Sequence, residues 1–254
     1  MTMDWKAYND LAWLEPIIAP AEEYREEAER YIEAITAKLA RKAPGKPAML
    51  HLGCGAGGHD AHFKHHFRVT GVDVSPGQLE IAAGRNPEVD YKPGDMRTFD
   101  LDRRFDVVAI PDSIMYMTTK EDLKAVLADG ARHLAPGGVL FFVVHTKEEF
   151  QNNNFVYTAE EDGGQLHVTV FENNHILPGG DSYEAAMVFL IRENAQLRIE
   201  HDVHTLGLFN LDTWMNALKE EGFTADVKNA DDLYDHALME NGEYKLKMFT
   251  CTKK

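Results

Sequence analysis

The sequence predicts an α/β protein: a doubly wound, Rossmann-like, seven-stranded and mostly parallel sheet with an antiparallel β insertion after strand five. Three observations support this prediction. Short apolar runs alternate with helical segments, a glycine-rich turn follows the first run, and residues 150–206 change to a two-residue alternation. Alternating strands and helices favour a parallel sheet with right-handed crossovers.

The elements of the α/β part follow from hydrophobic spacing and breaker residues. A long helix is expected over 22–41, because its apolar residues recur every three or four positions. Strands are expected at 48–52, 69–74, 89–92, 105–110 and 139–144, with helices at 59–66, 76–85 and 120–133. A helix at 211–221 and strands at 224–227 and 245–251 complete the sheet.

The insertion is predicted from alternation. Apolar and polar residues alternate over 166–170, 183–191 and 197–203, with a turn at 193–196, which is typical of antiparallel strands. We therefore divide the chain into an N-terminal helical lid (1–45), a cofactor-binding domain (46–149 and 207–254) and the insertion (150–206). The insertion is assigned to substrate binding or to a homodimer interface, since an exposed sheet edge can pair with its twin.

Composition limits the partners and the compartment. The formal net charge of −16 disfavours nucleic acid and anionic membrane surfaces as partners. Two cysteines form no disulfide framework, and the N-terminus lacks a signal-peptide pattern. We therefore expect a cytoplasmic protein that acts on a small molecule.

The glycine-rich turn after the first strand predicts a nucleoside cofactor. Gly53, Gly55 and Gly57 allow a tight turn and a close approach of the ligand to the backbone. Asp73, at the end of the second strand, suits the two ribose hydroxyls. Because Gly53, Gly55 and Gly58 also satisfy G-x-G-x-x-G, an NAD(P)-dependent oxidoreductase is an alternative.

Further motifs favour another class. Five segments occur in one order: HLGCGAG at 51–57, GVDVS at 71–75, GDMR at 94–97, FDVV at 105–108 and LAPGGV at 134–139. In these motifs the chain resembles the class I S-adenosylmethionine-dependent methyltransferases over roughly residues 47–145. The resemblance implies S-adenosyl-L-methionine as cofactor and S-adenosyl-L-homocysteine as product.

The resemblance also implies roles for individual residues. The amides of the glycine loop, including Cys54, would hold the amino-acid end of the cofactor, and Asp73 its ribose. Asp95 would bind the adenine amino group, while Met96 and Val74 cover the ring. The carbonyl of Pro111, or of the residue before it, would accept from the cofactor ammonium.

The parts outside the central domain resemble the bacterial sugar N,N-dimethyltransferases. The shared pieces are YNDL at 8–11, EY at 23–24, SIMY at 113–116 and DVHTLGLF at 202–209. This resemblance implies that Tyr8 caps the cofactor carboxylate and that Tyr116 faces the reacting centre. The insertion departs from the need for a diphosphate site, because Arg192 and Arg198 are its only Lys or Arg residues, against nine acids. A small neutral or cationic acceptor is therefore favoured.

Histidines are the candidate bases, since their pKa lies near neutrality. His145 ends the fifth strand, at the ligand-binding edge of the sheet, and His204 shares a polar strand face with Asp202. The histidines at 59, 62, 65 and 66 lack a completing ligand set, so we expect a solvated helix face and no metal.

The predicted function is methyl transfer from S-adenosylmethionine to a small molecule. An amine nitrogen is expected to receive the methyl group, and oxygen is the next choice. A non-catalytic module that binds the same cofactor is a further alternative, alongside the oxidoreductase.

Overall fold

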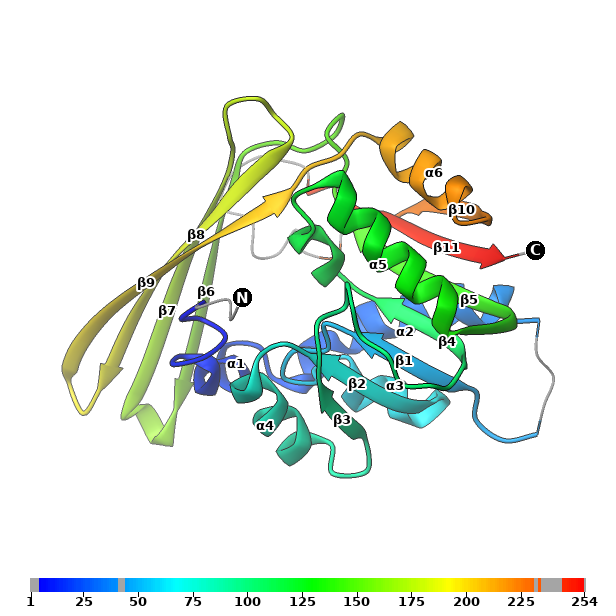
Figure 1. Cartoon of the computed structure of the whole chain (residues 1–254). Helices are drawn as coiled ribbons and strands as arrows, with labels where there is room; N and C mark the ends of the chain where they lie inside the picture. The colour runs from blue at the N-terminus through cyan, green and yellow to red at the C-terminus, as the bar shows by residue number, and fades with distance from the viewer. Residues whose placement is uncertain (1–4, 41–43, 231–232, 234–243, 254) are drawn as a thin grey trace.

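The computed structural model of the chain describes residues 5–40, 44–230, 233 and 244–253, and it contains two sheets. Figure 1 shows the four long strands β6 to β9 beside an α/β layer, with the N-terminal segment between the two parts. The large sheet has the order β10-β11-β5-β4-β1-β2-β3 and the small one β6-β7-β8-β9. Within the described part of the chain, no helix is long and apolar enough to cross a bilayer.

The large sheet is parallel apart from one strand. Its members are β1 (Ala48–Leu52), β2 (Arg68–Asp73), β3 (Asp90–Pro93), β4 (Phe105–Ile110), β5 (Leu134–Val144), β10 (Phe223–Asn229) and β11 (Lys247–Lys253). Strand β11 runs antiparallel to both β5 and β10. The small sheet is antiparallel throughout and comprises β6 (Asn153–Glu161), β7 (Leu166–Ile176), β8 (Ser182–Glu193) and β9 (Gln196–Gly207). The predicted fold class, including the insertion after strand five, is confirmed.

The helices lie before, between and after these strands. They are α1 (Glu15–Ile18), α2 (Arg25–Lys38), α3 (Asp60–His66), α4 (Pro76–Arg85), α5 (Lys120–His133) and α6 (Leu211–Glu220). Short 3-10 turns are η1 (Ala12–Leu14), η2 (Ala21–Tyr24), η3 (Ser113–Tyr116) and η4 (Asp162–Gly164). The capping oxygens of Ser75 and Thr119 accept from the amides of Gln78 and Asp122, which fixes the starts of α4 and α5 as the sequence predicted.

The main differences from the sequence prediction are two element starts and one missed strand, while other ends shift by a few residues. The long helix begins at Arg25, because Pro20 is extended and the following residues form the 3-10 turn η2. Strand β5 begins at Leu134, which pairs with Phe105 before a register shift. Strand β6 was not predicted, although Phe155 lies on its inner side, because Asn and Thr interrupt its apolar pattern.

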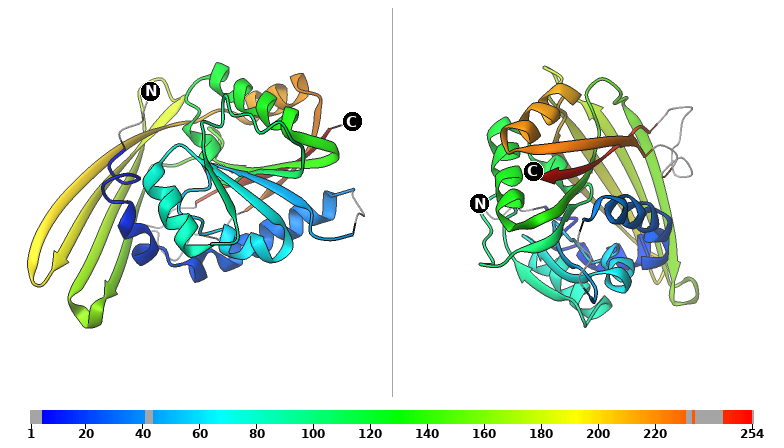
Figure 2. Two further views of the ribbon diagram at one scale, coloured as in Figure 1. Left: turned by 60° about the horizontal axis from the view of Figure 1, so that its bottom comes forward. Right: turned by 90° about the vertical axis from the view of Figure 1, so that its right-hand side faces the viewer.

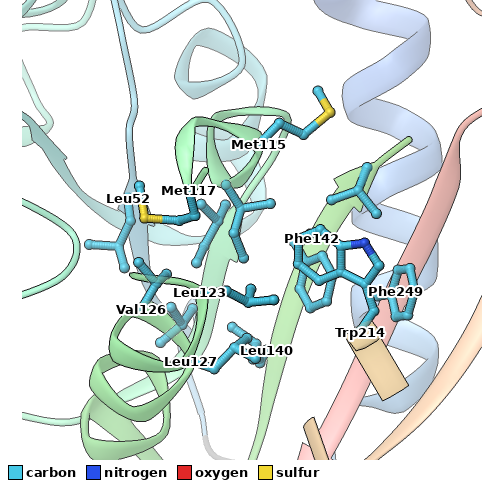
Figure 3. Close-up of a cluster of buried hydrophobic side chains, with 14 of the residues drawn as sticks. Leu52, Met115, Met117, Leu123, Val126, Leu127, Leu140, Phe142, Trp214 and Phe249 are labelled. Carbon is cyan, nitrogen blue, oxygen red and sulfur yellow. The ribbon is translucent and has the colours of Figure 1, made fainter. Parts of the chain in front are cut away.

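Two apolar cores sandwich the large sheet, one on each face. The first contains Leu123, Val126 and Leu127 of α5, and Trp214 of α6 (Figure 3). Trp214 packs on Phe142 of β5, whose ring stacks on Phe249 of β11 at 4.7 Å (Figure 3). The second core packs α2 and α3 on the opposite face. Burial of both faces explains why β1, β4 and the second half of β5 are almost entirely apolar.

A third core joins the small sheet to the N-terminal segment. Leu11 and Leu14 pack against Val168, Val170 and other residues on the inner face of β7 and β8. The views in Figure 2 agree that the N-terminal segment runs along this sheet. Because the segment also contacts α4 through η1, it closes the space between the two sheets.

Candidate active site

A cavity of about 360 Å³ lies at the carboxyl ends of β1, β2 and β4. Its other walls are the N-terminal segment and the inner face of the small sheet. Most predicted site residues line it: Tyr8, Gly53, Cys54, Gly55, Asp73, Val74, Asp95, Met96, Pro111, Tyr116 and His204. Gly57 and His145 are not among the lining residues. This is the edge of a doubly wound sheet where ligands bind.

The backbone amides of the glycine loop donate hydrogen bonds within the protein. The amides of Gly53 and Cys54 both donate to the carbonyl of Val72, and the amide of Gly57 donates to Cys54. The amide of Gly55 donates to Asp73 Oδ2 at 2.8 Å. Gly53, Cys54 and Gly55 therefore shape the floor of the cavity. The expectation that the loop amides hold the cofactor stays a prediction, and in this structure these four amides are already hydrogen-bonded within the protein.

Close approach explains two of the glycines. Gly53 has a φ of +66°, and a Cβ there would overlap the side chain of Ser113. Gly57 has a φ of +73° and packs against Tyr91 and Asn86 behind the loop, which explains its place outside the cavity lining. A Cβ on Gly55 would meet only Gln78, at 3.7 Å, so its glycine leaves open space at the cavity floor.

Asp73 and Val74 lie together beyond the end of β2. The Asp73 carboxylate accepts from the amides of Gly55 and Ser75, at 2.8 and 2.9 Å. Burial raises its pKa, and these amide bonds oppose the rise. Val74 is 43% exposed although it is apolar, which fits a residue that a bound ring would cover.

Asp95 and Met96 form the next part of the wall. Both Asp95 oxygens accept from the Arg97 guanidinium, which lowers the pKa of that carboxyl. Asp95 therefore faces Arg97 in this structure, while Met96 lies against Gly53. Arg97 also pairs with Asp122 of α5 at 3.1 Å, so its charge is matched on two sides.

Beyond β4, an acidic group lies deep in the cavity. Asp112 follows Pro111, has a φ of +58°, and its Oδ1 has no hydrogen-bond partner among the described residues. Burial raises the pKa of Asp112 to about 7, helped by the charge of Glu27. His59 Nε2 lies 3.2 Å from Glu27 Oε2. Burial lowers the pKa of His59, but the carboxylates of Glu27, Asp112 and Asp60 together raise it above its usual value.

Glu27, His59 and Asp112 each offer one ligand atom, all within 4.8 Å of one another, so they could hold a metal ion. The expectation of no metal stays a prediction. The expectation of a solvated histidine face is wrong for His59, which is 9% exposed, because its ring stacks on Tyr31 of α2. The unpaired Asp112 oxygen also fits a ligand ammonium beside Pro111.

A hydrogen-bonded chain crosses the outer part of the cavity. The Tyr8 and Tyr116 hydroxyls lie 2.7 Å apart, and Tyr116 Oη lies 2.8 Å from His204 Nδ1. His204 Nε2 lies 3.0 Å from Asp202 Oδ2. Burial lowers the pKa of His204, against the raising effect of Asp202, and burial raises that of Tyr8 to about 12. Three of these residues were predicted separately, and the fold brings them together.

The same chain ties the N-terminal segment to the insertion. The amide of Ala7 donates to Asp202 Oδ2 at 2.7 Å, and Lys6 pairs with Glu200. The Trp5 ring lies 4.4 Å from the Tyr116 ring and 5.0 Å from His204. The segment thus covers the cavity through contacts that are distant in sequence.

His145 lies behind the cavity wall. Its side chain is 2% exposed, and Nδ1 lies 2.8 Å from the carbonyl of Lys245. The ring packs edge-on against Phe150 and Tyr244. Burial lowers the pKa of His145 to about 4. A catalytic role for His145 stays a prediction, and its position between wall residues does not favour it.

Sequence reasoning missed part of the wall on the insertion side. Glu172 and Asn174 of β7, Tyr183 of β8 and Tyr244 before β11 all line the cavity. Their inward direction depends on strand register and on the pairing of β7 with β8, which local alternation does not reveal. The alternation of Tyr183 with polar neighbours was the one available signal.

The parallel sheet, the glycine loop, the acid after β2 and the cavity at the strand ends define a Rossmann-like methyltransferase. A family model described as "Methyltransferase domain" matches residues 49–138. The dTDP-3-amino-3,4,6-trideoxy-alpha-D-glucopyranose N,N-dimethyltransferase of Streptomyces venezuelae is 32% identical over 189 residues, which cover 72% of this chain and 76% of that protein. The chain therefore belongs to the S-adenosylmethionine-dependent methyltransferases, in the group that includes the sugar N,N-dimethyltransferases.

Other similar proteins are also methyltransferases of this kind or share the fold. The dTDP-4-amino-2,3,4,6-tetradeoxy-D-glucose N,N-dimethyltransferase of Saccharopolyspora spinosa is 29% identical over 82% of both chains. The structure of Streptomyces venezuelae DesVI shares the fold with a TM-score of 0.77 over 96% of both chains, at 24% identity. CalS10, an amino pentose methyltransferase of Micromonospora echinaspora solved with S-adenosylmethionine, gives a TM-score of 0.72 at 25% identity, over 89% of this chain and 91% of that one. S-adenosylmethionine is the methyl donor of this enzyme.

Proposed function

We propose that the enzyme transfers methyl groups to an amine nitrogen of a small molecule held between the cofactor and the small sheet. The observation that supports this most directly is that one cavity joins the glycine loop to polar side chains on the inner face of β7 to β9, among them Glu172, Asn174 and His204. Donor and acceptor can therefore be placed in one chamber. The relatives, named for N,N-dimethyl transfer, support nitrogen as the acceptor atom.

Methyl transfer requires the protein mainly to position the acceptor beside the methyl group. S-adenosylmethionine supplies a methyl group that is already activated on a sulfonium. The chain's residues orient the nucleophile and exclude water, which accounts for much of the acceleration of such reactions. The closed position of Trp5 and Tyr8 over the cavity serves this exclusion.

Nitrogen is favoured over oxygen by the character of the nearby base. His204, whose pKa burial lowers, is a weak base. A weak base can take a proton from an ammonium through Tyr116, whereas an alcohol needs a stronger one. We propose Tyr116 and His204 as the polar pair beside the acceptor, with Asp202 as a positioning residue for His204.

The relatives are named methyltransferases, which argues against an oxidoreductase and against a non-catalytic module. The test is a turnover assay of the purified chain with S-adenosylmethionine and a panel of amines and matched alcohols, with product mass measured. Methylated amines and S-adenosylhomocysteine are the expected products. Methylation of the alcohols alone would contradict the proposal.

We further propose that 1–45 acts as a lid and that the insertion forms a homodimer. The outer face of the small sheet exposes Phe171, Val188, Leu197, Ile199 and Val203, each 39–61% exposed. Contiguous apolar surface of this kind marks an interface. Sedimentation should show a dimer that Ile199→Lys converts to a monomer, and a monomeric wild type would contradict this.

A cytoplasmic location is also proposed, since Cys54 and Cys251 are free thiols.

A further inference from the structure

The acceptor end of the cavity carries an acid among aromatic rings. Glu172 lies on the inner face of β7 and lines the cavity together with Tyr8, Tyr116, Tyr183 and Tyr244. Its Oε1 accepts from Asn174 Nδ2 at 2.7 Å, and Tyr157 donates to the same carboxylate. Two donors thus fix the carboxylate in place on the cavity wall.

The four tyrosines are close enough to Glu172 to respond to its charge. Burial is the main cause of the raised pKa of each hydroxyl, and the negative charge of Glu172 adds to it in all four. The rings come from the N-terminal segment, η3, β8 and the segment before β11. Burial raises the pKa of Glu172 itself, and the bonds from Asn174 and Tyr157 oppose that rise. Glu172 is therefore the carboxyl that the four rings share, and it lacks a cation as counter-charge among the described lining residues near it.

The cavity offers no matching site for a diphosphate. Of the described residues that line it, Arg97 is the only lysine or arginine, and Asp95 and Asp122 already pair with it. Five lining residues are acids: Glu15, Asp73, Asp95, Asp112 and Glu172. A phosphate group placed here would meet carboxylates without a compensating cation, which is costly in a buried site.

We propose that Glu172, with the rings of Tyr8, Tyr116, Tyr183 and Tyr244, binds the ammonium form of the methyl acceptor, which is therefore a cationic amine without a diphosphate. The nitrogen gives its proton through Tyr116 to His204 before it attacks the methyl group, and methyl transfer then restores its positive charge. Aromatic faces and a carboxylate are the groups that recognise alkylated ammonium ions. The proposal rests on the proposed function, and it separates this enzyme's acceptor from the dTDP-linked sugars for which its relatives are named.

The test measures how the charge and the shape of a ligand affect its binding to the enzyme saturated with S-adenosylhomocysteine. Calorimetry with choline, with its neutral isostere 3,3-dimethyl-1-butanol and with thymidine diphosphate measures each affinity. We expect choline to bind at least about tenfold tighter than the isostere, and thymidine diphosphate not to bind. Tighter binding of thymidine diphosphate than of choline, or equal binding of choline and the isostere, would overturn the proposal.

Three variants test whether the Glu172 carboxylate causes the preference for choline. Glu172→Gln should remove the preference for choline, while Glu172→Asp, which keeps the charge, should retain most of it. Glu184→Gln is the matched control, because Glu184 lies on the opposite face of the neighbouring strand β8. An unchanged preference in Glu172→Gln would overturn the assignment.

S-adenosylhomocysteine binding is measured first in every variant and confirms the fold. A wild type that binds this product but turns over no amine defeats the proposed function. A wild type that methylates amines without a preference for positive charge defeats only the present inference.

Discussion

The two ends of the cavity are built in different ways. The cofactor end comes from short motifs at the ends of β1, β2 and β4, each contiguous in sequence. The acceptor end joins Tyr8, Glu172, Tyr183, His204 and Tyr244, which lie in five separate segments. The edge of the large sheet thus forms the donor end, while the insertion and the N-terminal segment form the acceptor end. The comparison predicts that mutations at one end leave the other end's binding intact.

The largest expected effect is on the fold at the cofactor end. Gly53→Ala should lower the free energy of unfolding by about 3–4 kcal/mol, because it adds overpacking against Ser113 to the strain of a positive φ. Urea unfolding measures this. Gly163→Ala is the control, since Gly163 has a similar φ of +62° but nothing within 4 Å of its Cβ. Its loss should be near 1 kcal/mol, and equal losses would contradict the close-approach argument.

The second-largest expected effect is on the affinity for S-adenosylmethionine, with the acceptor end unaffected. Asp73→Ala should weaken S-adenosylmethionine binding by about 1.5–3 kcal/mol, the value of hydrogen bonds to a charged group. Calorimetry measures the dissociation constant, and choline binding to the saturated variant should stay unchanged. An unaltered dissociation constant in a folded variant would refute the assignment of Asp73 to the ribose.

The third prediction concerns the wall behind the acceptor end. The folded pKa of His145, about 4, lies below the unfolded value of about 6.5. The unfolded chain therefore takes up the proton first, so this contribution to stability is complete above pH 6.5 and is lost as the pH falls toward 4. Between pH 8 and pH 5 it should cost about 2 kcal/mol.

Urea titrations at both pH values test this contribution, with His145→Asn as the comparison, because its amide can still donate to the Lys245 carbonyl. The variant should lose less stability on acidification than the wild type. If the two lose the same amount, His145 is solvated. If His145→Asn instead lowers turnover more than cofactor affinity, the original prediction of a catalytic role is supported.

The smallest predicted effect is at the junction of the two ends. Tyr116→Phe removes the hydroxyl between Tyr8 and His204 and should lower kcat about tenfold, or about 1.4 kcal/mol. The dissociation constant of S-adenosylmethionine should change little, because Phe keeps the ring contact with Trp5. Steady-state kinetics and calorimetry together decide this. A weaker cofactor affinity at unchanged kcat would place Tyr116 with the donor.

The difference between the ends also explains what the sequence could predict. Spacing and breakers predicted β1, β4, α4 and α5 at their observed bounds, because each depends on local pattern. The cofactor residues from Gly53 to Pro111 follow strand ends, and most of them line the cavity. The amides of the glycine loop could not be predicted to be occupied, since Val72 and Asp73 reach them only after the sheet forms.

The acceptor end depends on long-range register. His204 was placed on a polar strand face, but its bond to Tyr116 requires β9 to pack beside η3. Nothing in the sequence distinguishes Glu172 from the other acids of the insertion. The register of β7 with β8 places it on the inner face of the small sheet. His145 ended the right strand, but Phe150 and Tyr244 enclose its ring. Such contacts have no local signal.

The most direct test of this division is one calorimetric series with S-adenosylhomocysteine on the wild type, Asp73→Ala and Glu172→Gln. Both residues are acids that line one cavity, so charge alone does not distinguish them. We expect Asp73→Ala to raise the dissociation constant more than about tenfold and Glu172→Gln to leave it unchanged. Equal weakening in both variants would contradict this expectation, because the two ends of the cavity would then form a single site.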